Sequence, residues 1–298
     1  MNPSLPATLI GLHPDLPNDV YHADSAASKS RLDAIARSPA HYYAQFIQGQ
    51  RPEPTDAMIF GTAVHCAVLE PQRFVKEYVV APKDAPRRPT SLQLNAKKPS
   101  DATIAAIRFW EEFERANSGK QILTSEDYQH CEGMSRSVRE HPAAEMILSS
   151  GRAEQSLFWM DGPSGVRCKV RPDWLTKDLR ILADLKTTDD ARPQAFQRSV
   201  ENYRYFVSAG MYLDGVEAVT KTRPESYVFI AVEKSPPYAC VVYTANQQMI
   251  IDGAAEYRRN LETLRSCEKS GQWPAYPDVV TEIDRPRWAR SQEQFQVI

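Results

Sequence analysis

The chain has 298 residues, of which 42% are hydrophobic and 25% are charged, and its net charge is −2 with a pI of about 6.3. These values are typical of a folded globular protein and exclude a broad cationic surface of the kind that coats nucleic acid. Because the sequence has no apolar run of membrane-spanning length and no evident signal peptide, we expect a cytoplasmic protein without membrane contact.

The first 50 residues predict an irregular start followed by two short helices. Four prolines among the first 17 residues forbid a long helix before residue 27. Ser28 or Ser30 can cap a helix that ends near Ala36, and Ser38 can start a second helix that runs to about Gln48. We expect the apolar side chains of both helices to pack against a core.

A largely buried helix is predicted over residues 56–70, with Thr55 as its cap. The helix places His65 among apolar neighbours. Gly61 lies one turn earlier on the same face, where it would let another backbone or a ligand approach closely. A lone histidine on such a helix is usually a packed core residue, although a neutral imidazole can also bind a cation beside carboxylates.

Residues 71–100 contain five prolines and predict an extended, loop-like segment. Composition alone favours a solvated, flexible insertion. The alternative is a basic flap that touches the DNA backbone, because cationic side chains gather here. The candidate DNA-binding residues of this flap are Arg87, Arg88, Lys97 and Lys98.

Two helices follow this segment. Apolar residues at helical spacing predict the first over residues 101–116. The second starts at the Thr124 cap and runs towards Leu148, with a kink at His141-Pro142. His130 and His141 have no companion pattern, so we interpret both as structural.

Residues 154–187 predict three antiparallel strands joined by hairpins, because runs of β-favouring residues alternate with strong turn signals. The expected strands cover residues 155–160, 165–171 and 179–187. Glu154 begins the first strand, and Asp173 ends the second. The last hairpin would bring Asp173 beside Asp184 of the third strand.

The polar residues of the third strand carry the functional signal. Asp184 and Lys186 are two positions apart, so both project from one face of a strand whose other residues are apolar. Burying these charges is costly unless they are paired or hold a metal ion. One interpretation is an ordinary cross-strand ion pair. The other adds Asp173 and Glu154 to form an oxygen-rich site for a hard divalent cation, with Lys186 assisting phosphodiester cleavage.

The remainder predicts a helix over residues 192–215, strands over 225–233 and 239–244, and a long helix from the Asn246 cap to about Ser270. The expected fold class is therefore α/β, with a mixed central sheet flanked by helices and a helical N-terminal region.

We expect one domain over residues 1–298. Residues 1–150 would form its mainly helical part, with the basic proline-rich loop at 80–100. Residues 151–275 would form the catalytic sheet and its helices, and residues 276–298 an extended tail.

Several motifs resemble a known nuclease family. Pro172-Asp173 followed by Asp184-Leu185-Lys186 resembles the PD-(D/E)xK signature, and Glu154 lies where that superfamily often has a further acidic ligand. The segment DVYHADSAASKSRLDAIARSPAHYYAQF and the box GTAVHCAVLEP resemble the exonuclease VIII (RecE-type) nuclease domains of phages and prophages. The resemblance spans about residues 15–275 and implies a restriction-endonuclease-like fold.

The resemblance also implies which residues act. His65 would join Glu154, Asp173 and Asp184 as metal ligands, and the Leu185 backbone carbonyl is a further candidate because it lies between two site residues. The catalytic set would be Lys186, which assists the attacking water, with Asp173, Asp184, Glu154 and Tyr212. Tyr212 matches the tyrosine of the family's Q-x-x-x-Y helix, but Ser208 stands in the glutamine position.

The implied activity is Mg²⁺-dependent exonuclease action on double-stranded DNA ends, with Mn²⁺ able to substitute. The family degrades 5′ to 3′ and leaves 3′ single strands for recombination. It forms closed rings, here expected to be trimers or tetramers, and works with a single-strand annealing protein of the RecT type.

Three alternatives remain open. An iron–sulfur nuclease needs three clustered C-terminal cysteines, whereas only Cys240 and Cys267 lie late in this chain, so we expect no cluster. A structure-selective endonuclease could use the same fold. A non-catalytic DNA-binding module with a relic site is disfavoured because all five site residues, from His65 to Lys186, are present together.

Overall fold

The computed structural model describes residues 9–284. Its centre is a five-stranded sheet with the order β10-β9-β8-β7-β4, in which β8 and β9 run parallel and the other neighbours run antiparallel. The expected mixed sheet is therefore confirmed. Its strands are β4 (Gly151–Ala153), β7 (Trp174–Thr176), β8 (Ile181–Thr188), β9 (Ser226–Glu233) and β10 (Cys240–Thr244).

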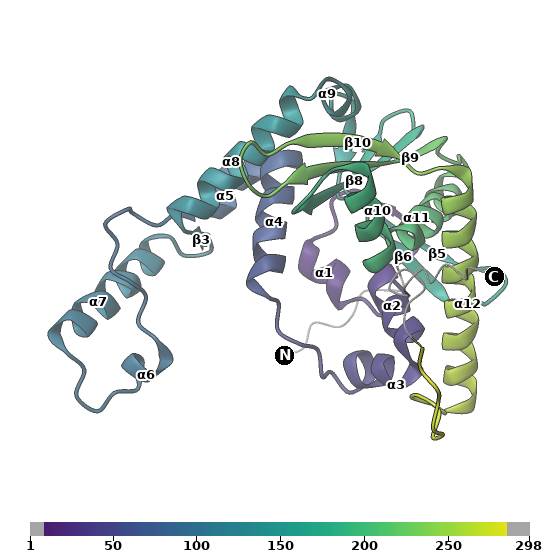
Figure 1. Ribbon diagram of the computed structural model, residues 1–298, viewed down its shortest axis with the longest axis horizontal. Coiled ribbons are helices and arrows are strands. Elements are labelled where there is room, and N and C mark those ends of the chain that lie inside the picture. The colour runs from purple at the N-terminus through teal and green to yellow at the C-terminus, as the bar shows by residue number, and fades with distance from the viewer. Residues whose placement is uncertain (1–8, 285–298) are drawn as a thin grey trace, which may run out of the picture.

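Helices cover both faces of this sheet (Figure 1). Alternate residues of β8 point to opposite faces, so Ala183 and Leu185 pack towards one helical layer and Leu182 towards the other. The first layer contains α4 (Asp56–Leu69), α8 (Ser125–Glu140) and α9 (Pro142–Leu148). The second contains α2 (Lys29–Arg37), α10 (Pro193–Asn202), α11 (Tyr205–Thr220) and α12 (Gln247–Ser270). Asp184 and Lys186 share the face of Leu182 and point towards the second layer.

Residues 154–187 were predicted to form three consecutive antiparallel strands of one sheet, and this prediction is wrong because these strands belong to two different sheets. β5 (Ser156–Met160) and β6 (Arg167–Val170) form a hairpin that joins β1 (Gly11–His13) in a separate sheet of order β1-β5-β6. The reason lies at Glu154, which does not begin a strand. Its φ of 54° bends the chain between β4 and β5, so that β4, and not β5, pairs with β7.

The caps read from the sequence are confirmed. The side chains of Ser28, Ser38 and Thr55 accept hydrogen bonds from the first turns of the helices that follow them. The region before residue 27 was expected to be irregular, but it contains β1 and α1 (Asn18–Ala23). After Ser38, α3 (Pro39–Tyr42) continues into a short π-helix, η1 (Tyr43–Ile47).

Residues 71–80 were expected to form a loop, and this expectation is wrong. They form α5 (Pro71–Glu77) and β2 (Tyr78–Val80), because Pro71 suits the first turn of a helix and Phe74 and Tyr78 bury stacked rings 4.8 Å apart. β2 pairs in parallel with β3 (Gln121–Leu123). The single kinked helix predicted over residues 124–148 is two helices, α8 and α9, which are separated at His141, the site of the predicted kink.

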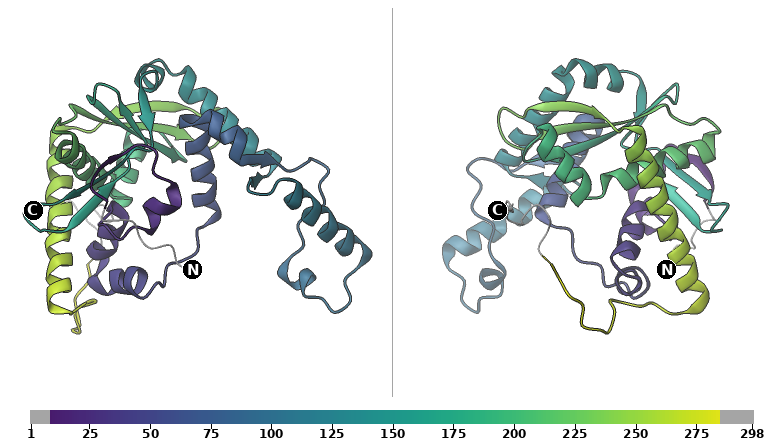
Figure 2. Two further views of the ribbon diagram at one scale, coloured as in Figure 1. Left: turned by 180° about the vertical axis from the view of Figure 1, so that it is seen from behind. Right: turned by 45° about the vertical axis from the view of Figure 1, so that its right-hand side comes forward.

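Residues 81–120 lie between β2 and β3 and form a projecting segment that we call the arm. It carries α6 (Ser91–Leu94) and α7 (Asp101–Ala116), and both figures of the whole chain show these helices well away from the sheet (Figures 1 and 2). Most side chains of residues 81–100 are exposed. The basic proline-rich loop therefore belongs to a structured arm.

The helix predicted over residues 192–215 is two helices, α10 and α11, separated at Tyr203 and Arg204. Arg204 has a φ of 56° and is held there by Asp33 and Glu256, which are distant in the sequence. Residues 276–284 contain no helix or strand, whereas the rest of the predicted tail lies outside the described residues. Within residues 9–284, no helix has the length and apolar character needed to cross a membrane.

Candidate metal centre

Asp173 and Asp184 meet where β7 and β8 pair. The register places Trp174 opposite Ala183, which sets the preceding Asp173 beside Asp184. The backbone N–H of Leu185 donates a hydrogen bond of 2.7 Å to Asp173 Oδ2. The β7–β8 hairpin thus brings these two carboxylates together, although Asp173 precedes β7 and does not end the predicted strand over residues 165–171.

His65 and Glu154 approach Asp173 from two other elements. One ligand atom from each of the three residues lies within 4.8 Å of the others, and His65 Nδ1 is 3.5 Å from Asp173 Oδ2. Glu154 has a left-handed backbone, and its N–H donates to the Asp173 carbonyl at 3.3 Å. This conformation costs a residue other than glycine about 1–2 kcal/mol and is typically retained at functional sites. The bend that separates the two sheets therefore also places Glu154 at this cluster.

Asp184 is the most buried carboxylate of the group, with 4% of its surface exposed. Its Oδ2 lies 2.7 Å from Lys186 Nζ, yet this oxygen forms no hydrogen bond of acceptable geometry within the described residues. A carboxylate buried this deeply is costly unless it is paired or holds a cation, so Lys186 stabilises its charge and a bound metal ion would do so further. Three carboxylates and one imidazole suit a hard divalent cation.

The electrostatics of the cluster follow from burial. Burial lowers the pKa of His65 to about 4, so the imidazole is neutral and able to bind a metal ion. Burial raises the pKa of Glu154 to about 7, and burial together with Asp184 raises that of Asp173. Burial opposes the charged form of Lys186, but Asp184 and Asp173 outweigh it and raise the pKa of the lysine. Lys186 therefore stays protonated beside the carboxylates.

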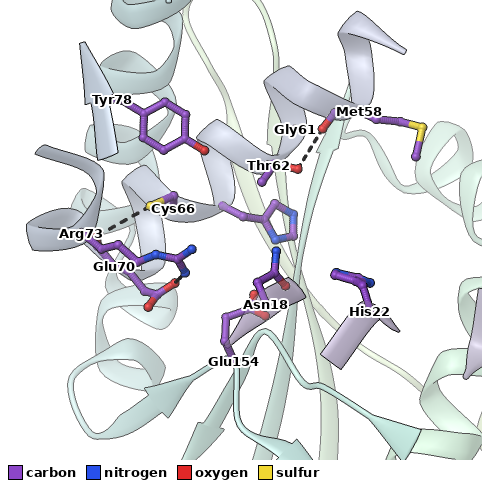
Figure 3. Close-up of a pocket in the computed structure, with 11 residues that line it drawn as sticks. Asn18, His22, Met58, Gly61, Thr62, Cys66, Glu70, Arg73, Tyr78 and Glu154 are labelled. Atoms are coloured by element: carbon purple, nitrogen blue, oxygen red, sulfur yellow. Dashed lines mark hydrogen bonds and ion pairs between the residues drawn. The ribbon is translucent and has the colours of Figure 1, made fainter. Parts of the chain in front are cut away.

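Two cavities meet at Glu154. The first has a volume of about 400 Å³ and lies between α1 and α4. Figure 3 shows Asn18 and His22 of α1 on one side of it, facing Gly61 and Thr62 of α4, with Glu154 nearby.

The second cavity, of about 330 Å³, contains the remaining site residues. It is lined by Asp173, Asp184 and Lys186, and it also includes Tyr212 and Ser208 from α11. The ring of Tyr212 packs edge-on against Tyr227 at 6.5 Å, and burial raises its pKa well above the usual value. Tyr212 therefore acts there as a neutral side chain.

The second cavity is also lined by cations that sequence reasoning missed. Within residues 9–284, Arg31, Arg51, Lys169 and Arg171 form no ion pair with a carboxylate. Lys169 Nζ donates to the backbone carbonyls of Tyr21 and Asp24 at 2.5 and 2.9 Å. Neutral acceptors thus hold this charge in place without neutralising it.

Arg171 is held in the same manner. Its guanidinium donates to Ser156 Oγ, Asn18 Oδ1 and the Leu16 carbonyl at 2.8–2.9 Å. A signal for this cation was present in the sequence, because Lys169 and Arg171 alternate with Cys168 and Val170 immediately before Pro172-Asp173.

The structure does not bring the four candidate DNA-binding cations to the metal centre, because Arg87, Arg88, Lys97 and Lys98 lie on the arm. Arg88 is engaged there: it pairs with Glu114 at 2.6 Å and lies 4.1 Å from the centre of the Trp110 ring. Leu185, the other predicted contributor, has a buried side chain, and its backbone interacts with both Asp173 and His65.

Residues 28–284 match the family described as a PDDEXK-like domain of unknown function (DUF3799). The chain belongs to this PDDEXK-like family. The predicted relation to the PD-(D/E)xK superfamily and the predicted fold are thereby confirmed. Members of this superfamily typically depend on divalent metals, which agrees with the donor set described above.

One solved structure supports this fold, and two further structures are similar over parts of the chain. A candidate exonuclease from Eubacterium rectale is similar over 91% of this chain and 96% of its own, with a TM-score of 0.58 and 11% identity. A phage-related exonuclease from Haemophilus somnus 129PT matches over 63% of this chain and 92% of its own, with a TM-score of 0.32 and 10% identity. An alkaline exonuclease from Laribacter hongkongensis matches over 70% and 97%, with a TM-score of 0.26 and 14% identity. No curated protein sequence matches the chain.

Proposed function

We propose that this PDDEXK-like protein is a divalent-metal-dependent exonuclease acting on double-stranded DNA ends, with Mg²⁺ as its ion and Mn²⁺ as a substitute. The observation that carries the proposal is the meeting of His65, Glu154 and Asp173 within 4.8 Å of one another, next to Asp184 and its partner, the protonated Lys186. A purely structural cation site has no use for that lysine, whereas phosphodiester cleavage does.

The roles of the residues follow from their positions. His65, Glu154, Asp173 and Asp184 would hold the cation, with the Leu185 carbonyl as a further ligand. When bound, the cation lowers the pKa of the attacking water and offsets negative charge on the phosphate. Lys186 would orient the water or stabilise the charge that develops in the transition state, since its ammonium is fixed beside Asp184.

The second cavity supports binding of a DNA strand beside the metal centre. Its unpaired cations, Arg31, Arg51, Lys169 and Arg171, would bind backbone phosphates of the strand being cut. The 5′-to-3′ polarity, the 3′ tails, the RecT-type partner and a ring of three or four copies are proposed from the family resemblance alone.

The reaction is tested with linear duplex labelled at the 5′ or the 3′ end and with covalently closed circular duplex. We expect loss of the 5′ label and no cutting of the circle, with Mg²⁺ or Mn²⁺ only. Cleavage of the circle would favour the structure-selective endonuclease. Binding without cleavage under every metal condition would favour the relic site.

Two variants test the division of roles. Asp184→Ala should abolish both Mg²⁺ binding and cleavage, because it removes a ligand. Lys186→Ala should keep Mg²⁺ binding and lose about 100- to 1000-fold in turnover, as when a transition-state donor is removed. Calorimetry with Mg²⁺ and single-turnover cleavage measure these effects. Equal loss of Mg²⁺ affinity in the two variants would contradict the proposed role of Lys186.

A further inference from the structure

A stacked pair of tyrosines, one exposed and one partly buried, lies beside the metal centre at the break between α10 and α11. Tyr203 follows α10 and has 62% of its surface exposed. Its ring stacks on that of Tyr205, with centroids 5.5 Å apart and planes at 23°. The Tyr205 ring lines the second cavity and lies 4.9 Å from Lys186 Nζ. The pair therefore connects the surface to the catalytic lysine.

The backbone at this break is held by long-range contacts. Arg204 has a left-handed φ of 56°, and its guanidinium pairs with Asp33 of α2 at 2.9 Å and Glu256 of α12 at 3.0 Å. Lys29 Nζ donates to the Tyr203 carbonyl at 2.7 Å and pairs with Asp33 at the same distance. These contacts position the backbone of Tyr203 and leave most of its side chain open to solvent.

The chemistry of this surface suits a nucleobase. Tyr205 covers one face of the Tyr203 ring, and a planar base could stack on the other. Stacking on aromatic side chains is the usual way in which proteins hold unpaired bases, and it tolerates any base because each has a π face. The cations of the adjoining cavity would hold the phosphates of the same strand.

We propose that Tyr203 is a stacking subsite for an unpaired base of the DNA strand whose phosphate lies at Lys186. This inference rests on the proposed function and adds a preference for frayed or single-stranded ends. In a fully paired duplex the neighbouring bases already cover most base faces, so the stack is gained chiefly when the end is open.

The test uses the full chain in Ca²⁺, with DNA that carries fluorescent 2-aminopurine at either an unpaired or a paired end. We expect Tyr203→Ala to weaken binding to the unpaired end about 5- to 100-fold, the range that corresponds to one stacked base. Quenching of the 2-aminopurine should disappear as well. Tyr203→Phe and Tyr203→Trp should keep both effects, because the stack needs the ring and not the hydroxyl.

A matched control is Tyr276→Ala, which removes a tyrosine of the same 62% exposure that contacts His41 instead. It should change neither affinity nor quenching. If the wild type cleaves DNA but Tyr203→Ala binds and quenches normally, the subsite is wrong and the proposed function stands. If the wild type binds and quenches through Tyr203 but never cleaves, the subsite stands and the proposed activity is wrong. Absence of any DNA binding by the wild type overturns both.

Discussion

The buried ammonium of Lys169 is proposed to bind phosphate in the second cavity, and its burial lowers the free energy of unfolding. Burial lowers its pKa to about 8, and Arg31 and Arg167 act in the same direction, whereas Asp24 opposes them. In an unfolded chain a lysine titrates near pH 10.4. Between about pH 8 and 10.4 the unfolded state therefore binds more protons than the native state. The free energy of unfolding contributed by this residue should thus rise with pH across that window.

We predict opposite effects of pH on stability and on DNA binding through Lys169. Raising the pH from 7 to 9.5 neutralises the ammonium, which should favour folding and weaken the hold of the cavity on phosphate. Lys169→Met should reduce both pH dependences relative to wild type. Urea unfolding and DNA binding in Ca²⁺, each measured across this range, test the prediction. Lys177→Met, at an exposed turn, is the control and should leave both pH profiles unchanged.

At the scale of elements, α11 and α12 cross at very short distance. A Cβ atom at Gly253 would overlap the Phe206 carbonyl, and one at Gly210 would overlap the backbone of Ala254. Neither neighbour is the end of a flexible side chain, so neither can move aside cheaply. α11 also carries Tyr205, Ser208 and Tyr212, which line the second cavity. The close packing of α11 against α12 therefore determines where these three side chains lie.

We predict that Gly253→Ala destabilises the fold by at least 1–3 kcal/mol, about the cost of overpacking a core. Gly61→Ala is the matched control within a helix, because nothing lies within 4 Å of the added Cβ. Alanine there should stabilise the chain by about 0.5–1 kcal/mol through helix propensity. Chemical denaturation measures both. Equal stability of the two variants would show that the helices can separate without cost.

At the scale of the whole molecule, the arm is where this acidic protein could place positive charge against DNA. The net charge of −2 cannot attract DNA by itself. On the arm, Arg88 is already paired with Glu114, and its guanidinium lies over the buried ring of Trp110, whose indole N–H donates to the Pro86 carbonyl at 2.9 Å. Arg87 is exposed and has no ion pair among the described residues.

We therefore predict that the two neighbouring arginines differ. Arg87→Ala should reduce the slope of log affinity against log salt by about 0.9, the contribution of one phosphate contact on duplex DNA. Arg88→Ala should change that slope less and should make the arm more sensitive to limited proteolysis, because it removes the contact with α7. Salt titrations in Ca²⁺ measure the first effect. If neither variant alters the slope, the arm does not bind DNA in the proposed way.

Local signals determined much of this protein. Caps at Ser28, Thr55 and Asn246 located helix starts correctly, since a capping side chain bonds a backbone N–H only a few residues away. The spacing of Asp173 and Asp184 was equally informative, because a hairpin joins adjacent strands through a short turn. The PD-(D/E)xK relation could be read from those few residues.

Tertiary structure decided the rest, because it depends on contacts between residues far apart in the sequence. The separate sheet of β5 and β6 requires β1, which is more than 140 residues earlier, and the bend at Glu154. The break at Arg204 requires Asp33 and Glu256, and no residue beside it signals a helix end. The second cavity likewise depends on tertiary packing. Arg31 and Arg51 come to lie beside Lys169 and Arg171 only when the N-terminal helices pack on the β1-β5-β6 sheet. Hydrophobic alternation and residue propensity indicate which face of a helix or strand is buried. Which other element pairs with it depends on the burial and charge pairing of the complete fold.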